Sequence, residues 1–116
     1  MMHRSAEFPK FAELSELPID LSRGDEPWVV VASVSASDGD ELVYTWDEVA
    51  LSVFVRWESR SGQRLALSRE AIEKVSVSAE GSVITIVART SSAELRGELV
   101  VTVDEHVRVR DTLLQS

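Results

Sequence analysis

Hydrophobic and polar residues alternate over most of the chain from position 28 onward. The clearest example is residues 51–58, where apolar residues occupy every odd position. Residues 106–110 repeat the pattern, with Val107 and Val109 between charged or polar neighbours. A period of two places successive side chains on opposite faces of a β-strand, so one face can be buried while the other contacts water. The pattern predicts a small, mainly β domain.

Turn-forming residues divide this region into short strands. The segment 37–40, Ser-Asp-Gly-Asp, is typical of a tight hairpin turn because Asp-Gly readily adopts positive φ angles. Many short strands with few residues left for helices favour a single antiparallel β-sandwich, or a strongly curved meander that approaches a barrel, of about seven strands. We expect the strands at residues 28–36, 41–46, 49–58, 63–67, 75–79, 83–89, 94–103 and 106–110.

Residues 1–27 differ from the rest because they carry all three prolines and lack the alternation. We expect an N-terminal arm, irregular apart from a short helix in which Phe11 and Leu14 share one side. The arm should pack Phe8, Phe11 and Leu14 on the sheet of a β domain that spans residues 28–116, and free disorder is the alternative.

A second helical segment is predicted at residues 68–74. Ser68 is a suitable N-cap, Glu70 suits the positive end of a helix dipole and Lys74 suits the negative end. A continuing edge strand is the alternative at this position.

The net charge of −8 is unevenly distributed along the chain. Residues 1–58 hold 12 Asp+Glu against four Lys+Arg, whereas residues 59–116 hold eight of each. An acidic surface repels phosphate backbones and anionic lipids and attracts basic surfaces. The acidic charge could serve only to keep the protein soluble, or it could form a docking patch for a basic protein. The densest acidic stretch contains Asp38, Asp40, Glu41, Asp47 and Glu48.

The amino-acid composition excludes several kinds of site and segment. The chain has no cysteine, so it can form no disulfide and no thiolate metal site. No apolar run approaches the roughly 20 residues that span a bilayer, and residues 1–10 lack the apolar region of a signal peptide. We therefore expect a cytoplasmic protein that does not enter a membrane.

Catalytic chemistry is poorly represented. His106 has Asp104 and Glu105 beside it, but no serine lies in a Gly-x-Ser-x-Gly elbow, and a solvated strand histidine is favoured. Asp38 and Asp40 could offer oxygen ligands, yet they lack the spacing of a Ca²⁺ loop. We expect no enzyme activity, no cofactor and no metal site.

Nucleic-acid binding is also disfavoured. Arg56, Arg60, Arg64 and Arg69 lie around a predicted turn, and Trp57 adjoins them. In a chain with a net charge of −8, such a cluster is weak evidence for nucleic-acid binding.

Aromatic residues supply candidate contact points. Trp57 shares a face with apolar residues, which predicts a place in the core. Phe54 shares its face with polar residues, so it is either covered by the N-terminal arm or exposed as a binding anchor. Trp46, beside two acids, is the residue we most expect at an interface.

These observations favour a non-enzymatic acidic domain that binds a basic protein partner. A natural form is a small neutraliser, analogous to the immunity proteins that block toxins, although no motif identifies such a family. The predicted partner-binding residues are Asp38, Asp40, Glu41, Tyr44, Trp46, Asp47 and Glu48.

Two alternatives come from other functional classes. A barrel could enclose a small apolar ligand, in a cavity lined by Leu42, Tyr44, Val53 and Trp57. An exposed edge strand at residues 106–110 could instead pair between two copies and form a homodimer.

Overall fold

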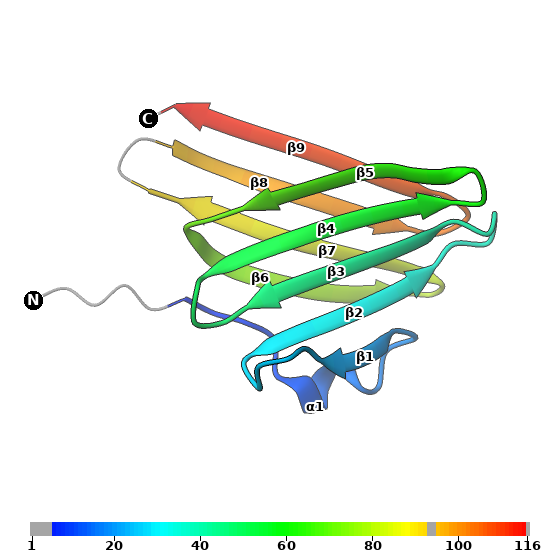
Figure 1. Cartoon of the computed structure of the whole chain (residues 1–116), viewed down its shortest axis with the longest axis horizontal. Coiled ribbons are helices and arrows are strands. Elements are labelled where there is room, and N and C mark those ends of the chain that lie inside the picture. Colours follow the sequence, from blue (N-terminus) through cyan, green and yellow to red (C-terminus); the bar gives the residue numbers. More distant parts are fainter. Residues whose placement is uncertain (1–5, 93–94, 116) are drawn as a thin grey trace, which may run out of the picture.

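The computed structural model describes residues 6–92 and 95–115. Within that part of the chain, nine strands form two antiparallel sheets that face each other, and one short helix lies beside them (Figure 1). Among the predicted architectures, the β-sandwich is confirmed.

The first sheet consists of β1 (Asp20–Arg23), β2 (Val29–Ser35), β3 (Glu41–Asp47), β4 (Ser52–Ser59) and β5 (Gly62–Arg69). Each strand pairs with the next one in the sequence. The predicted Asp-Gly turn joins β2 to β3, and Gly39 adopts there a φ of 96°, which a residue without a Cβ tolerates at little cost. The sheet is therefore a simple meander.

The second sheet consists of β6 (Ile72–Glu80), β7 (Val83–Ser91), β8 (Leu95–Val103) and β9 (Val107–Gln115). These strands also pair in sequence order. The two meanders follow one another along the chain, so the strands up to Arg69 build one sheet and the strands from Ile72 onward build the other (Figure 1).

Alternation along the strands fills the space between the sheets. On β3, Leu42, Tyr44 and Trp46 are fully buried, whereas Glu41 is exposed. Side chains from both sheets form one hydrophobic core. The buried residues of the second sheet include Ile72, Val75, Ile84, Ile86, Ala88, Leu99, Val101, Val103 and Val107.

The residues that the ligand-binding alternative placed around a cavity belong to this core. Leu42, Tyr44 and Val53 are at most 2% exposed, and Trp57 packs against the buried residues. The ligand-binding alternative remains a prediction.

The predicted helix at residues 68–74 is wrong. Strand β5 continues to Arg69 and β6 begins at Ile72. Between them Ala71 has a positive φ of 56°, its carbonyl accepts a hydrogen bond from the Ser91 N–H, and the Ile72 N–H donates to the Leu51 carbonyl. The backbone groups of this crossover thus find partners on neighbouring strands, and a local helix would leave those partners unpaired.

The N-terminal segment is more regular than its sequence predicts. Helix α1 (Phe11–Leu14) is followed by β1, which pairs with β2. Leu14 is buried, and Phe8 and Phe11 pack against the core. Glu7 forms backbone hydrogen bonds of 2.9 Å with Glu73 and Val75, so the chain beside α1 also contacts β6. Residues 1–5 of the predicted arm lie outside the described part of the chain.

Candidate functional site

The predicted partner-binding residues are divided between two ends of the sandwich. Asp38, Asp40 and Glu41 lie at the turn where β3 begins, and Asp47 and Glu48 lie where it ends. Seven residues of extended strand separate these ends, a distance of about 20 Å. The acidic stretch that is continuous in sequence is therefore two separate groups in space.

Tyr44 and Trp46 do not fit the predicted role of contact residues, because both are 0% exposed. They share the inner face of β3, where their rings meet edge to face with centroids 6.3 Å apart. Within the described residues the Tyr44 hydroxyl has no hydrogen-bond partner, and burial raises the pKa of this phenol above its ordinary value. Their function is to fill the core.

At the first end, Asp38 joins the two sheets. Its Oδ2 lies 3.0 Å from Nδ1 of His106 in the β8–β9 turn, and its Oδ1 accepts a 2.9 Å hydrogen bond from the Asp40 N–H. The Asp40 N–H, and after it the His106 ring, hold the pKa of Asp38 below its ordinary value. The same carboxylate raises the pKa of His106.

Backbone groups strengthen this joint. The Ser37 N–H donates to the Asp104 carbonyl at 3.2 Å, and the Asp38 N–H donates to the Glu105 carbonyl at 3.0 Å. The Asp104 carboxylate accepts the His106 N–H at 3.0 Å and pairs with Arg108 at 2.5 Å, contacts that lower the pKa of Asp104. His106 is therefore part of a structural connection between two turns.

The other predicted acids also have local structural partners. Asp40 accepts the Trp57 indole N–H at 2.8 Å, and Glu48 accepts the Trp46 indole N–H at 3.3 Å. Asp47 accepts the N–H groups of Val49 and Ala50 at 2.9 and 2.8 Å and so fixes the β3–β4 turn. Removing any of these carboxylates would disturb the fold as well as the surface charge, which complicates their use in binding tests.

The outer face of the first sheet carries an apolar centre with an acidic border. Phe54 is 43% exposed, and the sheet register places it in one cross-strand row with Val31 and Thr45. The described part of the N-terminal arm therefore does not cover Phe54, and its role as a binding anchor stays a prediction. Over the described strands, the charged residues of this face are Asp20, Glu41, Asp47 and Glu58 with Arg56 and Arg64.

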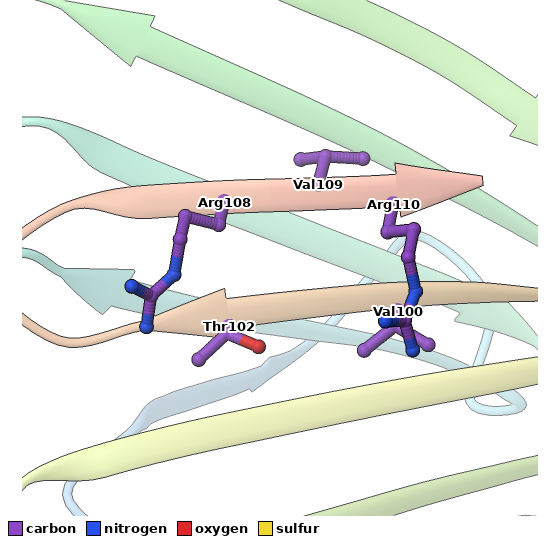
Figure 2. A pocket seen from close by; sticks show the side chains of 5 residues that line it. All are labelled: Val100, Thr102, Arg108, Val109 and Arg110. Carbon is purple, nitrogen blue, oxygen red and sulfur yellow. The ribbon is translucent and has the colours of Figure 1, made fainter.

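The outer face of the second sheet has the opposite charge. Figure 2 shows Arg108 and Arg110 extending from β9 across β8 toward Thr102 and Val100, where a shallow groove of about 300 Å³ lies. Within the described residues Arg110 has no ion-pair partner. Over the described strands, the charged residues of this face are Lys74, Arg89, Arg96, Arg108 and Arg110 with Glu80 and Glu98.

Sequence reasoning missed this basic face, although the residue pattern contains it. Arg108 and Arg110 are two positions apart, which places them on one side of a strand. The pairing of β8 with β9 adds the register that aligns Arg108 with Thr102 and Arg110 with Val100. Only the strand order brings arginines from separate strands onto one surface.

Metal-binding clusters and membrane-spanning helices are both absent from the described residues. No group of three or more His, Asp or Glu side chains there is placed to hold a metal ion. Over the same residues, no helix combines the length and apolar character that crossing a membrane requires.

Comparison with known proteins gives a likeness of fold. No family model and no curated protein sequence matches the chain. A chain from a solved structure, described as a contact-dependent growth inhibition toxin–immunity protein complex from Klebsiella pneumoniae 342, aligns with a TM-score of 0.76. The alignment covers 97% of this chain and 100% of that chain at 11% sequence identity. The two chains thus share a fold, with few residues in common.

Proposed function

We infer that this chain is a non-enzymatic protein-binding domain that neutralises a basic protein partner, in the manner of an immunity protein. The observation that carries this proposal is the unequal charge of the two halves of the chain. Residues 1–58, which form β1–β3 and all but the last residue of β4, hold the entire net charge of −8, whereas residues 59–116 are neutral overall. An acidic face of this kind attracts a basic partner and accelerates its association.

The comparison supports the same class of function. A fold shared with a chain of a toxin–immunity complex is compatible with a scaffold whose task is to bind another protein. Fold likeness does not define a partner, and the argument for a basic one comes from the charge of this chain.

Some acidic side chains are available for such a contact without disturbing the fold. They are exposed, and in the described part of the chain they form no ion pair. They surround α1, β1 and the turn that leads to β2, along one edge of the first sheet (Figure 1). This acidic edge consists of Glu13, Glu16, Asp20, Asp25 and Glu26.

Co-purification at low and high salt tests the proposal. A tagged chain expressed in its native host should recover a basic protein, and the yield should fall steeply as salt rises, because salt screens exposed charges. Recovery of no basic protein, or recovery that is indifferent to salt, would contradict the proposal.

Charge reversal at two places adds a matched control. Glu16→Lys with Asp25→Lys reverses two of the five charges of the acidic edge, and Glu80→Lys with Glu98→Lys makes the same change in net charge on the second sheet. The first pair should weaken the measured affinity by about tenfold and mainly lower the association rate, and the control pair should change it by less than about threefold. Equal losses of affinity from the two pairs would mean that the acidic edge acts only through the net charge of the chain and does not contact the partner.

A further inference from the structure

Phe54, the third residue of β4, is unusual among the large apolar side chains of the first sheet because it lies on the outer face. Thr45 and Ser68 flank it on β3 and β5, and Val31 lies beyond Thr45 on β2. Val31 and Thr45 are themselves partly exposed. The result is a small apolar area on an open sheet, and aromatic rings in such positions are enriched in the centres of protein interfaces.

Acidic side chains border this area in an arrangement that is unfavourable for the isolated protein. Glu41 and Glu58 occupy directly opposite positions on β3 and β4. Like charges at opposed positions destabilise a sheet. Arg56 pairs with Glu58 at 2.6 Å, and Glu41 has only a 3.2 Å contact with the Ser35 hydroxyl as a described side-chain partner. A bound cationic surface would relieve this repulsion.

The outer face of the second sheet has no comparable area on which a basic partner could dock. Its central residues Val87 and Val100 are smaller and only partly exposed. Arg89 and Arg110 stand beside them in the sheet register. Arg89 is paired with Glu98, as Arg56 beside Phe54 is paired with Glu58. The two faces differ in Arg110, which has no ion pair among the described residues and whose positive charge would repel a basic surface at close range.

We propose that the basic partner docks on the outer face of the first sheet, with Phe54 as its apolar anchor and Glu41, Asp47 and Glu58 as its charged border. This inference rests on the proposed function and assigns the surface that performs it. The occupant is a basic protein surface with an apolar depression for the phenyl ring. Charge complementarity selects it over a second copy of this chain, because each copy has a net charge of −8 and two copies repel each other.

Isothermal titration calorimetry with the purified basic protein recovered by the wild-type chain tests this surface. Phe54→Ala should weaken binding by at least about 30-fold, which is typical of a central anchor residue. Val100→Ala is the matched control, because Val100 is a partly exposed apolar residue on the outer face of the second sheet. The control should change the affinity by less than about threefold.

A second pair of variants tests the charged border and remains informative if Phe54→Ala folds poorly. Glu41→Gln with Glu58→Gln should lower the affinity at low salt and flatten its salt dependence. Glu80→Gln with Glu98→Gln removes the same charge from the outer face of the second sheet and should leave both quantities nearly unchanged. Circular dichroism melts verify that each variant is folded.

The outcomes separate the two proposals. If the wild type recovers no basic protein, both are overturned. If the partner binds the wild type and the Phe54 and Glu41/Glu58 variants equally well, only the assigned surface is overturned. If sedimentation velocity shows a wild-type dimer that Phe54→Glu dissociates, the face binds a second copy, and the assignment to a basic partner is overturned.

Discussion

The two sheets of this sandwich have similar sizes and the same meander connectivity, yet they differ in composition. Residues 1–58, which form most of the first sheet, contain all seven aromatic residues and the whole net charge. The buried side of the second sheet consists almost entirely of Ile, Val, Leu and Ala, and its outer face is basic. Under the proposed function, the first sheet presents the contact residues and the second sheet supports it from behind.

Substitutions in the core should have the largest effect on the free energy of unfolding, and this effect should differ between the two sheets. Trp46→Ala, at a position that is 0% exposed, should lower the free energy of unfolding by about 3–5 kcal/mol, because it leaves a large cavity. Ile86→Val on the second sheet should cost only about 0.5–1.5 kcal/mol. Urea denaturation measures both values. Similar losses from the two variants would show that the core does not depend on the aromatic residues of the first sheet.

Tyr44→Phe should have a smaller effect of the opposite sign. The Tyr44 hydroxyl is buried and, in the described part of the chain, has no hydrogen-bond partner. Its removal should raise the free energy of unfolding by about 1 kcal/mol, because a buried polar group without a partner is destabilising. The same denaturation experiment measures the change. A clear loss of stability would indicate that the hydroxyl is hydrogen-bonded in solution.

The smallest effect on stability is expected at the joint between the sheets, which is the contact of Asp38 with His106. The raised pKa of His106 means that its pairing with Asp38 stabilises the protein fully below the ordinary histidine value of 6.5, and that this stability is lost as pH rises through the folded-state pKa. The lowered pKa of Asp38 has the opposite sense, so its contribution is present above 3.8 and is lost as pH falls through the folded-state pKa. The joint should therefore be strongest between these two values.

Thermal melts at several pH values test this window. The melting temperature of His106→Gln should differ most from that of the wild type near pH 5–6 and should converge with it at alkaline pH. Glu70→Gln serves as the control, because Glu70 is exposed in the β5–β6 connection at the opposite end of the sandwich. A difference that stays constant over the whole pH range would mean that the ion pair does not connect the turns in solution.

Most strands could be predicted from the sequence, and particular residues show why others could not. The alternation at Val53 and Val55 repeats a buried-exposed pattern that any sheet requires, and the Asp-Gly turn defines its own geometry. Strand β1 is only four residues long and follows Pro18, so it has too little periodicity to be recognised. The helical signals at Ser68 and Glu70 were local, and pairing with Phe54 and its neighbours on β4 outweighed them.

The candidate site divides in the same way. The sequence by itself determined the mainly β class, the alternation of faces and the accumulation of acid in the front half, because each depends on neighbours along the chain. Only the tertiary structure decided that Trp46 is buried and Phe54 exposed. Both residues lie in strands with partly apolar faces, and which face is covered depends on where the second sheet packs. The separation of the acidic and basic faces has the same origin, since it arises when strands distant in sequence are placed side by side.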